Sequence, residues 1–447
     1  MGEAVDARPK KTFFLDMFTR DISLEDAILD LIDNAIDALC KTRSIDLSVH
    51  YVKNDGVPTP TGAEGYEDVA PAKIGVSFAD SGFKIIDNCG GIPYQRAKEE
   101  VFLFGRTSTK TNLGLSVYGV GLKRAIFKLG KKITVESRTG EEAWIVEIDV
   151  DKWSNIDEWT FPIEKKEIKG NGEDAGTTVT VTDLNPEVKM RFKDGTLGAT
   201  LKQAVATTYP LFLGKYVSIT INEVEVKSQL IAMAESADIE SSYLQFKEDD
   251  VDVVITTGLA ERMSGEWNQE RAGWYILCNS RVVVWADKTD LTGWGLIAPQ
   301  FHTKFRGFIG LVFFFSKDPE TLPWTTTKRG LNKESRVYQI TTKKMALAAR
   351  PVLDFLNRIS QGYNDQVSQG RAIDQMKPLS LHQVLSKSET AFTVAPRLSN
   401  KVTTVSVQYN ATMEELGRVR TCLNRPGISA SAIGRHAFDY FIEQECP

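Results

Sequence analysis

The sequence predicts an α+β protein of two or three domains, and three observations support this prediction. At 447 residues, the chain is about three times as long as a typical domain. An amphipathic helix over residues 23–38 precedes stretches that alternate like strands, at 46–52 and 73–79. After residue 195, a helix is followed by strands rich in aromatic and β-branched residues, at 271–289 and 306–318.

Composition excludes several classes of protein. Hydrophobic residues make up 42% and charged residues 25% of the chain, as in an ordinary globular protein. A net charge of −5 gives no whole-chain attraction to nucleic acid. The five cysteines form no CxxC pair, the four histidines are dispersed, and no apolar run approaches the roughly 20 residues of a membrane span. We therefore expect a cytoplasmic protein with reduced thiols, without a metal cluster and without a membrane partner.

The helix over 23–38 carries a line of polar side chains. Asp30, Asn34 and Asp37 recur at i, i+4 and i+7 and so share one side of the helix. Ser23 is placed to cap its first turn. A carboxylate one turn before a carboxamide suits a site where one group orients a water and the other holds a metal. The alternative is a solvated acidic face.

Four motifs resemble those of the GHKL ATPases, which include gyrase B, the ninety-kilodalton heat-shock chaperones, histidine kinases, MutL and the MORC proteins. DLIDNAIDA at 30–38 resembles the first motif and IIDNCGGI at 85–92 the adenine motif. GLSVYGVGLKRA at 114–125 resembles the phosphate lid and its helix, and GTTVTVTDL at 176–184 the strand closing the pocket. The resemblance implies a GHKL (Bergerat) α/β sandwich over residues 1–190, with ATP and Mg²⁺ as cofactors.

The resemblance also assigns roles on the first helix. Asn34 is expected to hold Mg²⁺, with Asp37 in the same nucleotide site. Asp30 stands where the family has a glutamate that activates the attacking water. Aspartate is one methylene shorter, and a general base needs hydrogen-bond reach, so we expect slow hydrolysis. Asp33 is an alternative base, but it points about 100° away from Asn34 around the helix.

Asp87 is expected to accept a hydrogen bond from the exocyclic amine of adenine. Gly90 and Gly91 are expected to let the backbone pass close to the base. Cys89 departs from the family pattern, which usually has glycine there, and predicts a crowded pocket wall. On the closing strand, Thr178 is expected to bind the nucleotide.

The phosphates are expected to meet a lid and a helix N-terminus. FGRTSTK at 104–110 resembles the lid segment of MutL-like proteins, and three glycines in 114–121 precede a helix over 122–129. Backbone amides at that helix start suit the β- and γ-phosphates, although the loop does not match the Walker pattern. Lys110 and Lys123 are candidates to add charge, with a solvated lysine as the alternative. The residues assigned here are Thr107, Ser108, Lys110, Gly114, Tyr118, Gly119, Val120, Gly121 and Leu122.

Residues 191–360 resemble the S5-like transducer domain of MutL, gyrase and MORC-like proteins. That domain typically sends one lysine back to the γ-phosphate, where a cation stabilises developing charge. Lys328, in a loop before a helix over 338–359, is our candidate for this catalytic role. Arg329 is the rival residue, and a surface basic pair is the other alternative.

The remaining chain is predicted as a connector and a small module. Residues 361–400 are polar and indicate a connector with at most a short helix. Residues 401–447 predict a strand at 402–409 and two helices, which together resemble a ribbon-helix-helix dimerisation module. Five basic and five acidic residues in this stretch make DNA contact the weaker interpretation.

Together these features predict an ATP-binding, slowly hydrolysing dimeric clamp of the MutL- or MORC-like type. The resemblance suggests a homodimer acting in DNA transactions or in defence against foreign DNA. A partner effector protein, such as a nuclease, would perform any cutting, since no nuclease motif is visible. A chaperone-type ATPase and a non-hydrolysing ATP sensor stay open as alternatives. A histidine kinase is disfavoured, because no phosphoacceptor helix precedes the nucleotide motifs.

Overall fold

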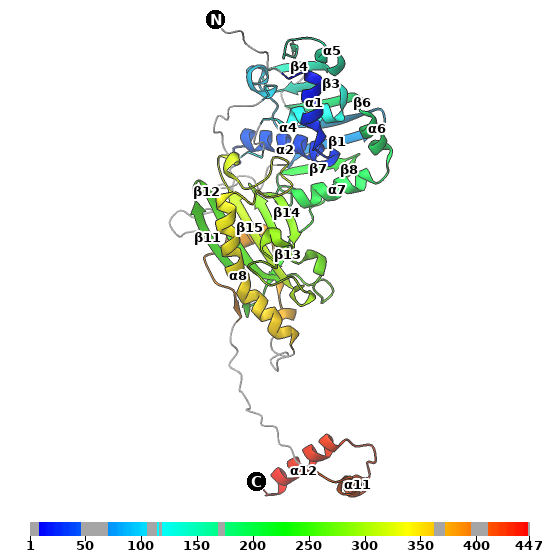
Figure 1. Cartoon of the computed structure of the whole chain (residues 1–447), viewed down its shortest axis with the longest axis vertical. Helices are drawn as coiled ribbons and strands as arrows, with labels where there is room; N and C mark the ends of the chain where they lie inside the picture. The colour runs from blue at the N-terminus through cyan, green and yellow to red at the C-terminus, as the bar shows by residue number, and fades with distance from the viewer. Residues whose placement is uncertain are drawn as a thin grey trace. The chain divides into compact units, whose positions relative to one another are not determined.

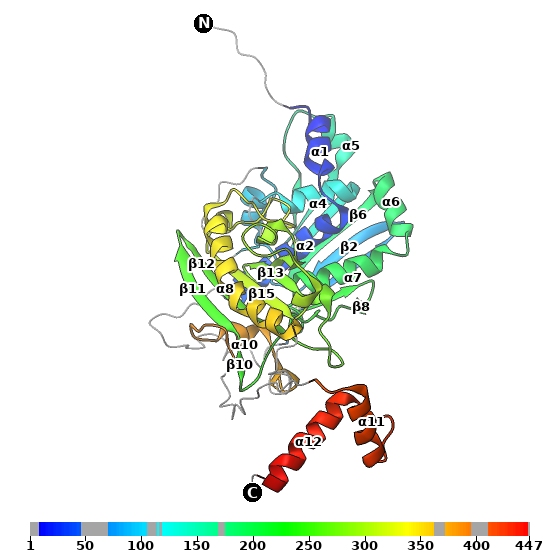
Figure 2. The ribbon, with the colours of Figure 1, turned by 60° about the horizontal axis from the view of Figure 1, so that its bottom comes forward.

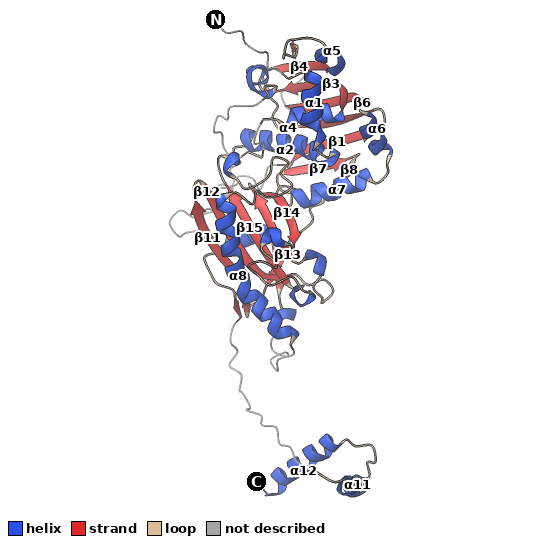
Figure 3. Cartoon of the chain, in the orientation of Figure 1, coloured by secondary structure: helices blue, strands red, loops and turns tan. Residues whose placement is uncertain are grey.

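The computed structural model describes residues 9–45, 70–104, 114–115, 119–168, 175–361, 372–394 and 410–445. The chain divides into two compact units, Met1–Ala395 and Pro396–Pro447. The larger unit contains two sheets with their helices, as Figure 1 and, by secondary structure, Figure 3 show. Within the described ranges, every helix is too short or too polar to cross a lipid bilayer.

The first sheet has the strand order β5-β4-β3-β6-β2-β1-β7-β8. Its neighbours pair antiparallel except β1 and β7, which are parallel. The strands are β1 Ala72–Ala79, β2 Gly82–Asp87, β3 Gly130–Arg138, β4 Ala143–Asp149, β5 Ile163–Lys166, β6 Gly176–Leu184, β7 Val217–Ile221 and β8 Val224–Glu225. The strand predicted at 73–79 is confirmed as β1, and the one predicted at 46–52 lies outside the described residues.

Helices α2 and α4 pack against each other over this sheet (Figure 1). The helices of this half are α1 Lys11–Arg20, α2 Leu24–Thr42, α3 Tyr94–Arg96, α4 Gly121–Leu129, α5 Val150–Ser154, α6 Pro186–Lys193 and α7 Leu197–Thr208; a π-helical turn, Ala97–Val101, continues α3. The predicted cap is confirmed, since Ser23 Oγ accepts a hydrogen bond of 3.0 Å from the amide of Asp26. The apolar side of α2, including Ala27, Ile28 and Ile32, is fully buried against the sheet.

The N-terminal helix α1 is a packed segment. The ring of Phe14 stacks on Phe18 and meets Phe104 and Trp159 edge-on. The ammonium of Lys11 is buried and donates to three backbone carbonyls at 153–158. Packing against its own chain thus accounts for Phe14 and Phe18, whereas Phe13 is exposed.

The second sheet has the order β14-β13-β15-β12-β9-β16, with β11 pairing β12. Helix α8 packs across β12 and β15, as Figure 2 shows. The strands are β9 Met233–Glu235, β11 Ser242–Glu248, β12 Val251–Ala260, β13 Gly273–Cys278, β14 Arg281–Asp287, β15 Phe308–Phe315 and β16 Lys377–Leu379; β10 Ile239–Glu240 and β17 Thr393–Val394 form a separate pair. The helices are α8 Arg336–Ser360 and α10 Leu381–Leu385, with 3-10 turns Gln269–Arg271, Asp290–Thr292, Thr303–Phe305 and Pro319–Thr321.

Two predicted boundaries differ from the structure. The hairpin β7–β8 belongs to the first sheet, because β7 pairs in parallel with β1, so the boundary at 190/191 does not separate the sheets. Part of the predicted connector 361–400 is folded: β16 pairs with β9, and Leu381, Val384 and Leu385 are buried beneath the second sheet. The polar composition of 361–400 conceals these few apolar residues, which are enough to dock the segment.

The smaller unit contains α11 Met413–Cys422 and α12 Ala430–Glu445, at the two predicted helix positions. Thr412 and Glu415 form a capping box at the start of α11. The strand predicted at 402–409 lies outside the described residues, so the ribbon-helix-helix interpretation stays a prediction.

Gly310 in β15 is a sensitive position in the core of the second sheet. It lies directly opposite Trp274 of β13, and a Cβ at Gly310 would lie 2.3 Å from the buried indole ring. We predict that Gly310→Ala destabilises the protein by about 1–3 kcal/mol, because the added methyl group would overpack the core. Urea unfolding measures this change. The control Gly198→Ala, in α7 with open space around it, should be neutral or stabilising; equal unfolding midpoints for the two variants would contradict the packing argument.

Candidate functional site

One cavity brings together most of the residues assigned from the sequence. It lies between α2, the ends of β2 and β6 and the start of α4. Residues 317–320, 326 and 328 complete its wall; they come from the half of the larger unit that contains the second sheet, called the second half below. The assigned residues in its wall are Asp30, Asn34, Asp37, Asp87, Gly114, Gly119, Val120, Gly121, Leu122 and Lys328. Thr107, Ser108, Lys110 and Tyr118 lie outside the described residues.

Asp87 closes one end of this cavity at the end of β2. Its Oδ1 accepts hydrogen bonds from the amides of Cys89, at 2.9 Å, and Thr177, at 3.3 Å. Burial raises the pKa of Asp87 above the ordinary carboxyl value, although these two amides act in the opposite direction. The carboxyl is thus fixed in position, and an amine donor in the cavity would favour its charged form.

Two residues assigned to the nucleotide site, Gly91 and Thr178, do not line the cavity. Gly91 does not line the cavity; its φ of +72° and the carbonyl of Arg138, 1.9 Å from where a Cβ would be, require glycine for backbone packing. Thr178 does not line the cavity either, whereas Thr177 and Val179 do. Successive side chains of a strand point to opposite faces, so Thr177 and not Thr178 faces this cavity. Cys89 is buried but does not line the cavity either, so the expected crowding of the wall by this side chain is not seen.

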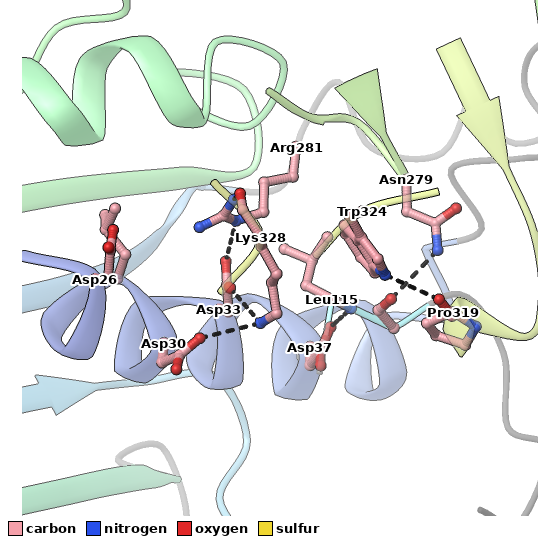
Figure 4. Close-up of polar contacts among 12 residues, drawn as sticks. Asp26, Asp30, Asp33, Asp37, Leu115, Asn279, Arg281, Pro319, Trp324 and Lys328 are labelled. Carbon is pink, nitrogen blue, oxygen red and sulfur yellow. Dashed lines mark hydrogen bonds and ion pairs between the residues drawn. The ribbon is translucent and has the colours of Figure 1, made fainter. Parts of the chain in front are cut away.

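The base of the predicted lid is held by α2. Asp37 Oδ1 accepts a hydrogen bond of 2.5 Å from the amide of Leu115, so Asp37 positions the residue after Gly114 (Figure 4). Gly121, the first residue of α4, lies against Asp30: a Cβ there would lie 3.2 Å from the Asp30 carboxyl carbon. Glycine therefore lets α4 approach the shorter aspartate closely.

Lys328 comes from the second half of the unit and lines the cavity. Its Nζ lies 3.3 Å from Asp30 Oδ1 and 2.6 Å from Asp33 Oδ2, between two carboxylates of α2 (Figure 4). Burial alone would lower the pKa of Lys328, but the charges of Asp33 and Asp30 outweigh burial and raise it. Arg329, the rival residue, instead pairs with Asp26. The interpretation of both residues as a solvated surface pair is wrong, because Lys328 is buried.

Asp33 is fully buried behind Lys328. Its Oδ1 accepts hydrogen bonds from Arg281 Nε at 3.0 Å and from the Tyr209 hydroxyl at 2.7 Å. Burial alone would raise the pKa of Asp33, but Arg281 and Lys328 outweigh burial and hold it below the ordinary value. Asp33 does not line the cavity, so it is not placed to act as the alternative base.

The neighbouring cations Lys123 and Arg124 of α4 point in different directions. Arg124 reaches the cavity, and its guanidinium lies 2.9 Å from Asp30 Oδ2. Lys123 points away into the protein, where its ammonium donates to the carbonyls of Val101 and Leu103. Lys123 is therefore buried, and the interpretation of a solvated lysine is wrong for it.

Sequence reasoning missed Arg124, Tyr209, Asn279 and Arg281. For Arg281 a signal existed, since it stands alone between the apolar runs of 273–278 and 282–286. A single charged residue in a buried hairpin requires a partner of opposite charge. Tyr209 and Asn279 gave no signal distinguishable from ordinary packing and turn residues.

The cavity fits the expected magnesium ion. The carboxamide of Asn34 lies in its wall one turn after Asp30, and Mg²⁺ prefers oxygen ligands. Among the described residues, no group of three His, Cys, Asp or Glu side chains could hold a metal alone. Mg²⁺ keeps several waters and takes further ligands from phosphates, so Asn34 would suffice as its protein ligand.

Most residues of the cavity wall come from a part of the chain that is similar to a known family of ATPase domains. Residues 22–178 match the family described as Histidine kinase-, DNA gyrase B-, and HSP90-like ATPase. No curated protein matches the chain. The family match supports the GHKL superfamily for this part of the chain, with ATP binding and hydrolysis as its class of activity.

We predict that Asp33→Asn destabilises the protein by about 3–5 kcal/mol, because it leaves Arg281 and Lys328 buried with too little negative charge. Urea unfolding followed by circular dichroism measures this loss. Asp290, whose side chain is 62% exposed, pairs with Lys333 on the surface, and the control Asp290→Asn should have no measurable effect. An Asp33→Asn protein as stable as the control would show that the buried pairs contribute little.

Proposed function

We propose that this protein is an ATP-dependent, slowly hydrolysing switch that works as a dimeric clamp. The position of Lys328 supports this function best. It comes from the second half of the larger unit, and its ammonium lies beside Asp30 in the wall of the cavity that also contains Asp87 and the start of α4. A γ-phosphate in this cavity would compete with Asp30 and Asp33 for Lys328. The placement of the second half would therefore depend on the nucleotide.

Asp30 is the proposed general base. In the structure its Oδ2 faces Arg124 and its Oδ1 faces Lys328, so release of Lys328 would open Oδ1 to a water molecule. Transfer of Lys328 from Asp30 to the γ-phosphate would provide this change. Catalysis would then begin only with a complete triphosphate in place, which suits slow turnover by a timed switch.

The smaller unit supports a second copy of this chain as partner. Phe438, Phe441 and Ile442 lie at i, i+3 and i+4 of α12 and are 47%, 58% and 44% exposed. An apolar face of this kind is stabilised when another copy covers it. Two chains held by their tails would keep their nucleotide domains at high local concentration, so that a weak ATP-dependent contact between them is sufficient.

We further propose that the clamp acts in DNA transactions or in defence against foreign DNA, with a partner effector protein such as a nuclease. This step is supported only by the similarity of the four motifs to those of MutL and MORC proteins. Because the tail has balanced charge, any DNA contact would depend on local basic patches and not on an overall field.

We predict that Asn34→Ala abolishes Mg-ATP binding, because it removes the protein ligand to magnesium. Asp30→Ala should leave binding within about threefold of wild type but stop turnover, because it removes the general base and no proposed ligand of the nucleotide. Calorimetric titration and a phosphate-release assay measure the two effects. Asp16→Ala, an exposed change on α1, is the control. If Asp30→Ala hydrolyses ATP normally, Asp30 is not the base.

Clamp closure predicts a change in shape with nucleotide. Size-exclusion chromatography with light scattering should show a dimer throughout, with a smaller hydrodynamic radius only when a non-hydrolysable ATP analogue is bound. Phosphate release should be stimulated by DNA and not by unfolded protein. A monomer with every nucleotide would refute the clamp, and stimulation by unfolded protein alone would favour the chaperone alternative.

A further inference from the structure

The tip of the β13–β14 hairpin is buried inside the larger unit. Asn279 and Ser280 have φ values of 45° and 68°, the left-handed conformations of a two-residue hairpin turn. Asn279, Ser280 and Arg281 are each only 1% exposed. Polar residues at a turn usually face water, whereas these residues are enclosed and contact the other half of the unit at Gly114 and Asp33.

Arg281 joins α2 to the Lys328 loop. Its Nε donates to Asp33, and its Nη1 donates to the backbone carbonyl of Lys328 at 2.6 Å. The backbone of Lys328 has a φ of 55°, a left-handed conformation that a residue with a side chain rarely adopts. Its amide also donates to the Thr325 carbonyl at 2.8 Å, which completes a tight loop. Arg281 thus fixes the backbone from which the Lys328 ammonium extends.

The charges around Asp33 are uneven. Two carboxylates, Asp30 and Asp33, face the cations Lys328, Arg281 and Arg124, which leaves one positive charge in excess. Without Arg281, Lys328 alone would balance Asp33 and would be held there.

The same hairpin tip also touches the predicted lid. Asn279 Nδ2 donates to the carbonyl of Gly114 at 3.3 Å and to that of Ser316 at 3.1 Å. In return, the amide of Ser316 donates to Asn279 Oδ1 at 3.0 Å. Gly114 precedes Leu115, the residue that Asp37 holds. One turn of the second half therefore contacts the lid base, helix α2 and the Lys328 loop.

We propose that Arg281 is a positioning residue for Lys328: it balances the charge of Asp33, which leaves Lys328 able to move to the nucleotide, and it holds the Lys328 backbone. This inference rests on the proposed ATPase function. Arg281 does not line the cavity, so its effect on the nucleotide passes through Lys328.

The test compares wild type, Arg281→Gln and the double variant Arg281→Gln/Asp33→Asn, with Arg336→Gln as control. Arg336 has a 73% exposed side chain and pairs with Glu248 on the surface. Calorimetry with a non-hydrolysable ATP analogue gives affinity and the fraction of competent sites, and turnover is expressed per competent site. Arg281→Gln should keep affinity within about threefold but lower kcat by about tenfold or more. The double variant should regain most of this turnover, because Lys328 is no longer held by a carboxylate at position 33.

A purely structural role would give a different result. Loss of competent sites with unchanged turnover per site, or a double variant no faster than Arg281→Gln, would overturn the proposal. Hydrogen exchange without nucleotide is an independent measurement: Arg281→Gln should speed exchange in 323–331 and leave β12 and β15 unchanged. An equal increase in exchange across the whole protein, or no increase in 323–331, would also overturn the proposal. If wild type binds no Mg-ATP, the proposed function fails instead, and the exchange result still tests the hold of Arg281 on the loop.

Discussion

The buried carboxylate of Asp33 is the interaction on which the arrangement of the larger unit depends. It is fully enclosed and is bonded to Arg281, Lys328 and Tyr209, which come from three separate segments of the chain. A buried charge without partners is very unfavourable, so these segments must meet α2 at this point. The two sheets are thereby held in one relative position by charge as well as by their continuous apolar core.

Helix α2 distributes its acidic residues over different neighbours. Asp26, Asp30, Asp33 and Asp37 follow one another at spacings of four, three and four residues, which keeps them on one side of the helix. Asp26 meets Arg329, and Asp30 meets Arg124. Asp37 holds the lid base at Leu115, while Lys328 lies between Asp30 and Asp33 (Figure 4). One helix thus contacts α4, the lid base and the Lys328 loop.

This arrangement explains why the predicted site and the second sheet cannot be considered separately. The cavity wall includes residues 317–320, 326 and 328 beside those of α2 and α4. A nucleotide bound there would contact both halves of the unit. The proposed coupling between binding and domain placement would then act through the Lys328 loop and the β13–β14 turn.

The sequence by itself determined the local elements: the amphipathic α2 with its Ser23 cap, the alternating strand β1, the helix α8 and the cavity residues on α2, β2 and α4. Apolar periodicity and capping depend on neighbours along the chain, so they can be read from it. Only the tertiary structure decided that Thr177 and not Thr178 faces the cavity, that β7–β8 joins the first sheet, and that Arg124 and Arg281 neutralise α2. Periodicity shows which face of an element is buried, but not which distant residue covers it, because that partner is chosen by packing and charge in three dimensions.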